Sequence, residues 1–221
     1  MRILVIAPHM DDEVLGVGGT IARHVAEGDD VFVCFIAHRI YNHTFDPEKD
    51  RIERESTENA RIVLGYKDSV FFDLDDERLD SCIQDILIPL EEYIVKVNPQ
   101  IVYVCHRGDN HQDHRAVFQA AMVALRPSAN PEIKKIMSYE VPSSTEQSPP
   151  FPEYAFSPTY YVNIGKYLPV KLKAMRCYEK EQREFPHPRS EEGLSIIAKR
   201  RGVESGYQAA EAFIVVRERR D

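Results

Sequence analysis

Two short clusters of side chains that can bind metals or transfer protons stand out in this chain of 221 residues. The first is Pro8-His9-Met10-Asp11-Asp12-Glu13, directly after the apolar run Ile3-Leu4-Val5-Ile6-Ala7. The second spans residues 106–114 and follows the similar run 101–105. Such runs are typical of buried strands, and charged groups beside a buried strand are unfavourable unless they bind or react with something. The sequence therefore predicts a functional site at two strand ends.

The spacing within each cluster favours a metal centre. His9 and Asp12 are three residues apart, as are His111 and His114, so each pair can face one point from a tight turn or a first helical turn. Two imidazoles and one carboxylate form the protein ligands of an open catalytic zinc site, with water in the fourth position. The same donors, without thiolates, also suit ferrous iron, so the spacing predicts a metal without fixing its identity.

Further carboxylates in the clusters suggest acid–base chemistry. Asp11 is adjacent to Asp12 but points elsewhere, which places it to take a proton from an attacking water. Asp113 lies next to His114 and near His111, so it is expected to orient an imidazole and hold it protonated. Taken alone, the acidic residues of the first cluster would be typical of helix capping, and the second cluster would be typical of a surface turn. Because both clusters follow predicted strands, a catalytic or metal-binding site is the favoured interpretation.

Alternating strands and helices must position these clusters. Apolar runs and turn residues predict strands at 2–7, 31–37, 69–74, 101–105 and 134–140, separated by helices at 13–28, 50–64, 80–97 and 113–125. This alternation predicts an α/β protein with a doubly wound, mostly parallel sheet. In the common strand order 3-2-1-4, ligands bind at the carboxyl ends of the first and fourth strands. That topology brings the two clusters together.

Other segments have two interpretations. The stretch from Val141 to Pro158 carries five prolines and is too long for an ordinary connection, which predicts a functional loop or lid. The loop with His38, Arg39, Tyr41 and His43 either lines a pocket or is solvated. Pro188-Arg189-Ser190 either caps a helix or contacts substrate. Residues 38–49 are expected to form a loop, with later strands near 159–164 and 212–217 and helices near 165–183 and 190–201.

Composition limits the class of protein. At 43% hydrophobic residues, the chain can bury one core, and a single domain over 1–221 is expected. The net charge of −8 and the scattered basic residues argue against nucleic-acid binding. Four separated cysteines fit a reducing, cytoplasmic compartment. No secretion signal and no membrane span are expected, because a strand begins at residue 2 or 3 and the apolar stretches are short.

The paired motifs resemble the PIG-L/LmbE-like family of zinc-dependent N-acetylglucosaminyl deacetylases, whose signature is Pro-His-Pro-Asp-Asp-Glu followed by a later His-x-x-Asp-His. Arg54…Ala60…Leu64-Gly65 and Ala210-Glu211-Ala212-Phe213 also match. The resemblance covers most of the chain. It implies a Rossmann-like, three-layer αβα fold and a hydrolase that removes an N-acetyl group from an acetamido sugar.

The resemblance also implies roles for individual residues. It implies one zinc ion per chain with the ligands His9, Asp12 and His114. Asp11 matches the general base, and His111 with Asp113 matches a histidine that acts in the transition state and its carboxylate partner. Arg54 matches a substrate-binding arginine, although Arg51 competes for that match.

Two departures and two alternatives stay open. Met10 stands where the family has proline, which changes the rigidity of the turn. Arg107 and Asp109 stand near the position where some relatives have a tyrosine that helps the oxyanion. The alternatives are an amidase of a sugar–thiol conjugate and a sugar-binding protein without turnover; Asp11 and His111 favour turnover. The expected partner is a small acetamido sugar, and homo-oligomerisation is left open.

Overall fold

A seven-stranded sheet forms the centre of the computed structural model, which describes residues 1–41 and 44–220. The strand order is β5-β2-β1-β6-β7-β9-β8. The strands are β1 Arg2–Ala7, β2 Asp30–His38, β5 Asp68–Asp75, β6 Ile101–Cys105, β7 Lys135–Tyr139, β8 Tyr160–Asn163 and β9 Ala210–Glu218. Neighbours from β5 to β7 are parallel, whereas β9 is antiparallel to both β7 and β8. The order 3-2-1-4 predicted for the first four long strands is confirmed.

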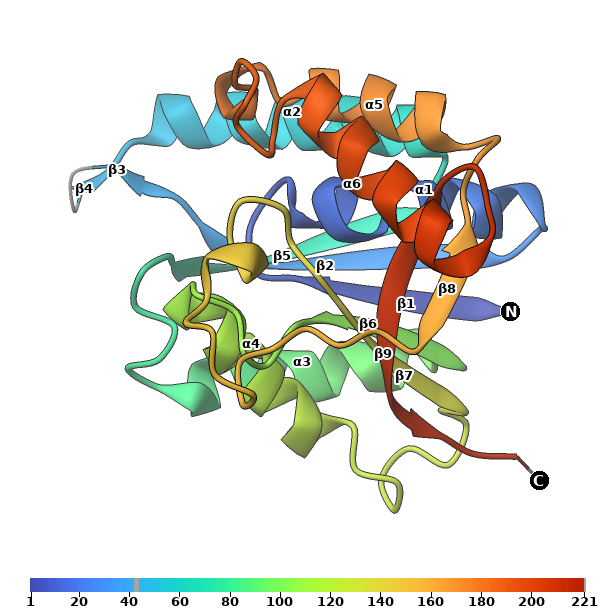
Figure 1. Cartoon of the computed structure of the whole chain (residues 1–221). Helices are drawn as coiled ribbons and strands as arrows, with labels where there is room; N and C mark the ends of the chain where they lie inside the picture. The colour runs from blue at the N-terminus through green and yellow to red at the C-terminus, as the bar shows by residue number, and fades with distance from the viewer. Residues whose placement is uncertain (42–43, 221) are drawn as a thin grey trace.

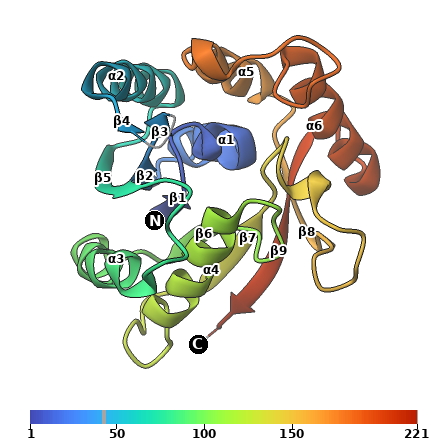
Figure 2. The same ribbon diagram turned by 90° about the vertical axis from the view of Figure 1, so that its left-hand side faces the viewer.

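Helices cover both faces of this sheet. In the described residues they are α1 Asp12–Ala26, α2 Pro47–Leu64, α3 Ile83–Val97, α4 Gln112–Ala124, α5 Leu168–Arg176 and α6 Glu191–Ser205. Figure 1 shows α1, α2, α5 and α6 on one face and α3 and α4 on the other. The view in Figure 2 shows the same three layers from the side. The predicted α/β three-layer architecture is confirmed, and no helix among the described residues has the length and apolar character needed to cross a membrane.

The strand β1 lies in the middle of the core. Residues 3–7 are completely buried, which explains why this run is apolar at every position rather than alternating. Its two parallel neighbours are β2 and β6. The carboxyl ends of β1 and β6 therefore lie side by side at one edge of the sheet.

The connection after β2 differs from the expected loop. Two short strands, β3 Ile40–Tyr41 and β4 Thr44–Phe45, pair antiparallel there, and α2 begins at Pro47 rather than near residue 50. Asp46 caps α2 by accepting hydrogen bonds from the N–H groups of Glu48 and Lys49, and proline fits the first helical turn. His43 lies outside the described residues.

A buried ion pair holds α1 against the C-terminal part of the sheet. The Lys171 ammonium donates to the Leu15 carbonyl at 2.8 Å and to the Glu211 carboxylate at 2.5 Å. Glu211 in turn accepts the N–H groups of Gly19 and Thr20, at 3.0 and 2.7 Å. Both charged groups are almost completely buried, and they are tolerated because each is paired and hydrogen-bonded. This arrangement fixes the helix whose first turn carries the acidic cluster.

Candidate metal centre and active site

Three potential ligand atoms converge where β1 and β6 end. His9 Nδ1 lies 3.2 Å from Asp12 Oδ2, and His114 Nε2 lies 3.3 Å from each of these two atoms. Zinc bonds to such ligands are about 2.0–2.1 Å, so neighbouring ligand atoms of a tetrahedral site are roughly 3.3–3.4 Å apart. The three atoms therefore have the spacing that one tetrahedral metal ion requires, and the residues present fit such an ion.

A carboxylate stands behind each of the two imidazoles. His9 Nε2 lies 3.0 Å from Asp113 Oδ2, on the side of the ring away from Asp12. His114 Nδ1 lies 3.2 Å from Asp109 Oδ1, although not along the direction of a hydrogen bond. Carboxylates behind ligating histidines fix the tautomer and orientation of the ring. This pattern assigns Nδ1 of His9 and Nε2 of His114 to the metal position.

The pairing of Asp113 with His9 corrects one expectation. The sequence suggested that Asp113 orients His111, but its Oδ2 lies 3.9 Å from His111 Nδ1. The carboxylate is held elsewhere because it accepts the N–H groups of Glu77 and Leu79, at 2.6 and 3.2 Å, as well as the contact with His9. The loop after β5, which supplies those N–H groups, turns the carboxylate toward His9.

The charges around the site favour a bound cation. Burial alone would lower the pKa of His9, but hydrogen bonds to Asp113 and Asp12 raise that pKa to about 9. Burial likewise opposes the charged form of His114, and the carboxylates of Asp12 and Asp109 raise its pKa to about 10. Burial would raise the pKa of Asp12, yet the two histidines hold that pKa well below its usual value. The carboxylates around His9 and His114 therefore favour positive charge at the point where the three ligand atoms converge.

Asp11 lies beside this centre in a strained conformation. Its φ of 120° is a region that residues with a side chain rarely adopt, and it is 1% exposed. The residue occupies the N-cap position of α1, but its carboxylate accepts none of the N–H groups of that helix, all of which are described. It pairs instead with the guanidinium of Arg189 at 2.9 Å. Burial raises the pKa of Asp11 to about 7, although Arg189 opposes this shift.

His111 is the more accessible histidine of the cluster. It is the N-cap residue of α4, and its Nδ1 accepts the backbone N–H of Asp113 at 3.3 Å. Burial and the positive charges of His9 and His114 lower the pKa of His111 to about 4. This direction is opposite to the protonated state expected from the sequence. A neutral ring that accepts at Nδ1 carries its proton on Nε2, so it can still donate a hydrogen bond.

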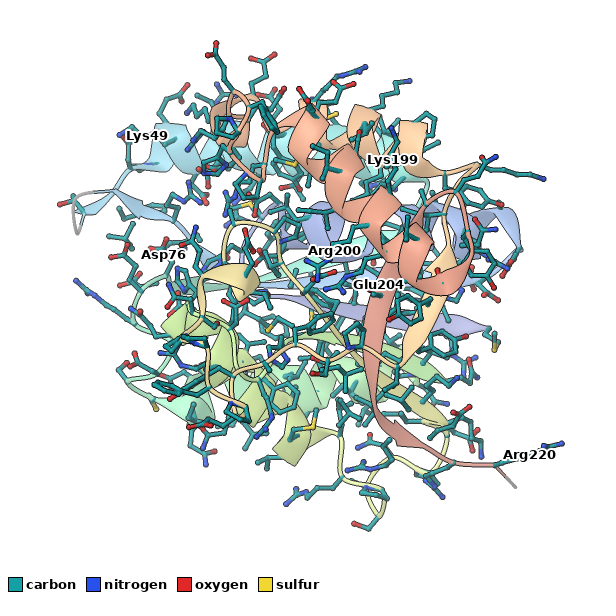
Figure 3. All side chains as sticks on the ribbon, in the orientation of Figure 1. Lys49, Asp76, Lys199, Arg200, Glu204 and Arg220 are labelled. Atoms are coloured by element: carbon teal, nitrogen blue, oxygen red, sulfur yellow. The ribbon has the colours of Figure 1, made fainter. Side chains whose placement is uncertain are left out.

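A polar cavity of about 420 Å³ opens over these groups. It collects residues from several loops at the carboxyl edge of the sheet, and Figure 3 shows one of them, Asp76, at the side of the molecule opposite to the N-terminus. Its walls are His9, Asp11, Arg39, Ile40, Asp76, Glu77, Asn110, His111, His114, Ser143, Ser144, Gln147 and Arg189.

Two segments for which the sequence allowed two interpretations, the loop with Arg39 and the segment Pro188-Arg189-Ser190, contribute to this cavity, and so does the Pro-rich stretch. That stretch supplies Ser143, Ser144 and Gln147, and Arg39 and Arg189 come from the two ambiguous segments. Arg54 lies away from the described cavity lining. It pairs with Asp50 and Asp73 and lies over the ring of Phe71. The structure does not bring Arg54 to the site, so its substrate role stays a prediction.

Sequence reasoning missed two buried carboxylates. Asp109 accepts hydrogen bonds from Ser144 and Thr145 and so ties the Pro-rich stretch to the metal centre. Its place inside the second cluster was a usable signal. Glu181 pairs with Arg39 and Arg189, two arginines that line the cavity. Nothing local in its helical surroundings distinguishes it from an ordinary surface glutamate.

Other groupings of ligand atoms are less suited to a metal. His9, His111 and Asp113 also approach one another, but Asp113 is occupied by backbone N–H groups. A third group contains His24, Glu27 and Asp29 near the other end of β1. There both ring nitrogens of His24 already have partners, at 2.7 Å from Asp29 and at 2.9 Å from the Tyr103 hydroxyl.

Comparisons with known proteins identify the family of the chain. A family model described as GlcNAc-PI de-N-acetylase (PIG-L) matches residues 4–125, which include both clusters. The uncharacterized deacetylase YaiS of Escherichia coli K12 is 32% identical over 183 residues, covering 80% of this chain and 90% of that protein. The diacetylchitobiose deacetylase of Thermococcus kodakarensis is 26% identical over 225 residues, covering 96% and 82%.

Solved structures show the same fold. The N,N'-diacetylchitobiose deacetylase from Pyrococcus horikoshii superposes with a TM-score of 0.77 at 24% identity, over 97% of this chain and 83% of that chain. The family match covers more than half of the chain, and YaiS matches it over most of both lengths. The chain belongs to the PIG-L family of de-N-acetylases.

Proposed function

We propose that this protein is a metal-dependent hydrolase that removes the N-acetyl group from an acetamido sugar and releases acetate and an amino sugar. The observation that carries the proposal is the convergence of His9 Nδ1, Asp12 Oδ2 and His114 Nε2 next to Asp11, at the floor of a polar cavity. Similarity over nearly the whole chain to a diacetylchitobiose deacetylase supports the sugar as substrate.

His9, Asp12 and His114 are the residues that would hold the metal. Zinc fits two imidazoles and a carboxylate with an open position, and ferrous iron accepts the same donors. When bound, the metal would lower the pKa of a water molecule and polarise the amide carbonyl. Asp113 orients the His9 imidazole from behind, and the Asp109 carboxylate lies beside Nδ1 of His114.

Asp11 is the general base of the proposed reaction. Its carboxylate takes a proton from the attacking water as that water adds to the amide carbon. The pKa of about 7 that burial gives Asp11 is close to the value at which a group both accepts and releases a proton near neutral pH. The same proton then passes to the leaving nitrogen as the carbon–nitrogen bond breaks, so that acetate and a free amine result.

His111 stabilises the oxyanion that forms in this step. As a neutral imidazole it donates the Nε2 proton to the developing negative charge, which does not require the protonated form expected from the sequence. The N-terminus of a helix lowers the pKa of a nearby histidine, and a histidine kept neutral in this way can still polarise a carbonyl by donating a hydrogen bond. The position of His111 at the N-terminus of α4 fits that role.

The cavity lining supports a polar substrate of sugar size. Its volume of about 420 Å³ is in the range of small-molecule sites, and its walls carry carboxylates, amides and hydroxyls that can bind sugar hydroxyls.

Acetate release from a panel of N-acetylglucosamine conjugates, with bound metal quantified, tests the proposal. We expect turnover at about one metal per chain and its loss on chelation. The matched control is Asp11→Asn, which should bind metal and sugar without turnover. Sugar binding by the wild-type protein without acetate release would instead support a sugar-binding protein. Cleavage of a sugar–thiol conjugate alone would support the amidase alternative.

A further inference from the structure

We infer that Arg189 is a positioning residue that holds the Asp11 carboxylate in the orientation needed to take the proton of the attacking water. The inference rests on the proposed function of Asp11 as the base. It concerns a residue outside the stretch 4–125 that the family model matches. It would make the C-terminal part of the chain a contributor to catalysis.

The contacts of Arg189 connect the base to two cavity walls. Nη1 donates to Asp11 Oδ2 at 2.9 Å and to Glu181 Oε2 at 2.6 Å, and Nε donates to Ser143 Oγ at 2.7 Å. The side chains of Arg189 and Asp11 are 19% and 1% exposed, so the pair is largely shielded from water. Since Arg189 binds through Oδ2, the carboxylate is left to react through Oδ1.

The backbone around Arg189 is itself fixed. Its N–H donates to His187 Nδ1 at 3.1 Å, and the next residue, Ser190, caps α6 by accepting the N–H of Gly193 at 2.9 Å. A side chain at Gly193 would place its Cβ 2.7 Å from the His187 carbonyl oxygen, so glycine permits the first turn of α6 to pack against this segment. The guanidinium is therefore delivered to Asp11 from a rigid support.

Asp11 needs such a support more than an ordinary carboxylate would. Its backbone is strained at φ 120°, and the neighbouring side chains of Asp12 and Glu13 are also buried carboxyl groups. Arg189 supplies a cation, and its planar guanidinium directs Nη1 to Asp11 and Glu181 and Nε to Ser143. Lysine would keep the charge but not the three directed contacts.

The first experiment compares wild type with Arg189→Ala and Arg189→Lys. If Arg189 positions Asp11, kcat falls roughly 10–100-fold in the alanine variant, the effect expected of a misplacement of about 1 Å, and less in the lysine variant. KM and metal content should stay within about twofold of wild type. Arg176→Ala is the matched control, because this exposed arginine pairs with Glu191 on the surface of the same part of the chain and should leave kcat unchanged.

The second experiment tests whether Arg189 acts through Asp11. In an Asp11→Asn background, Arg189→Ala should lower kcat by less than about twofold further, because the group it positions is already disabled. Guanidinium ions added to Arg189→Ala should restore part of the lost kcat, and added ammonium should not. A purely structural role would not respond to guanidinium.

Two results would overturn the inference. A raised KM with unchanged kcat would make Arg189 a substrate-binding residue, and full additivity with Asp11→Asn would show that it acts independently of the base. If the alanine variant melts well below wild type, the kcat of the lysine variant and the response to guanidinium decide whether Arg189 positions Asp11. Absence of hydrolysis by the wild type would refute the proposed function alone. Crystal structures would still decide the positioning, by showing whether Asp11 moves when Arg189 is removed.

Discussion

Metal binding should release two protons from this site near neutral pH. In the metal-free protein the pKa values of His9 and His114 are raised to about 9 and 10, so both rings carry a proton at pH 7. Each ring must lose that proton before its nitrogen can ligate a metal. The pKa of Asp12 is lowered, so this ligand is ionised throughout and contributes no proton.

The size of the effect follows from the number of protons. Below the two raised pKa values, each unit by which the pH falls lowers the apparent metal affinity by a factor of about 10 per released proton, which gives roughly 100-fold per unit for two protons. Between pH 8 and pH 6 the apparent dissociation constant should therefore rise about 10⁴-fold. Imidazoles with an ordinary pKa near 6.5 would give a far weaker dependence above pH 7.

Calorimetric zinc titrations at pH 7 in buffers of different ionisation enthalpy measure the released protons directly. The best background is Asp11→Asn, because Asp11 itself has a pKa of about 7 and would add to the count. His24→Ala is a matched control that removes a histidine from a distant cluster and should release the same number of protons. Release of fewer than one proton would refute the reasoning, since the rings would then be neutral despite the carboxylates around them.

The remaining predictions concern single changes. Asp12→Ala should lose metal affinity by at least 10–100-fold, whereas Asp11→Asn should keep the metal while kcat falls by roughly 10²–10⁴. Metal analysis and kinetics on both variants test this, and loss of the metal in Asp11→Asn but not in Asp12→Ala would mean that the two roles are reversed. His111→Ala should retain metal and lose roughly 10²–10³ in kcat, and a full loss of metal would instead make it a ligand. Gly16→Ala should destabilise the protein by about 1–3 kcal/mol in chemical denaturation, because the added Cβ would lie 2.2 Å from the Tyr139 ring. In protein freed of metal by chelation, the stability contributed by His9 and His114 should be fully present below about pH 6.5 and should be lost as pH rises to about 9 and 10, because the two imidazole pKa values are raised on folding; a melting temperature that rises over that range would contradict the assignment.

The parts of the site that the sequence could predict depend on local spacing and strand order. His9 and Asp12 converge because they share one turn, and His114 joins them because β1 and β6 are neighbours in the predicted order. The first contact can be predicted from the spacing of a few residues, and the second from the alternation of strands and helices. The same holds for most strand and helix positions, whose bounds differ from the predicted ones by only a few residues.

The parts that the sequence could not predict depend on where distant side chains meet. Asp113 turns toward His9 because the loop after β5 offers it backbone N–H groups, and no local pattern reveals that loop's position. Arg189 lines the cavity and pairs with Glu181, and both residues lie far along the chain from the two motif clusters. The start of α2 at Pro47 is different, because the Asp46-Pro47 pair is itself a local signal for the beginning of a helix.

The position of β9 sets a condition on how the chain can assemble during synthesis. β9 is the last strand of the chain, yet it lies between β7 and β8 and pairs with both. Domains fold as the chain emerges from its N-terminal end, so β7 and the short β8 must wait for residues 210–218 before either gains this partner. A ribosome-bound chain that stops before residue 210 would expose the edge of β7, and such unpaired edges promote aggregation. The two motif clusters would already have emerged by then, so a nascent chain could carry the metal ligands well before its sheet is closed.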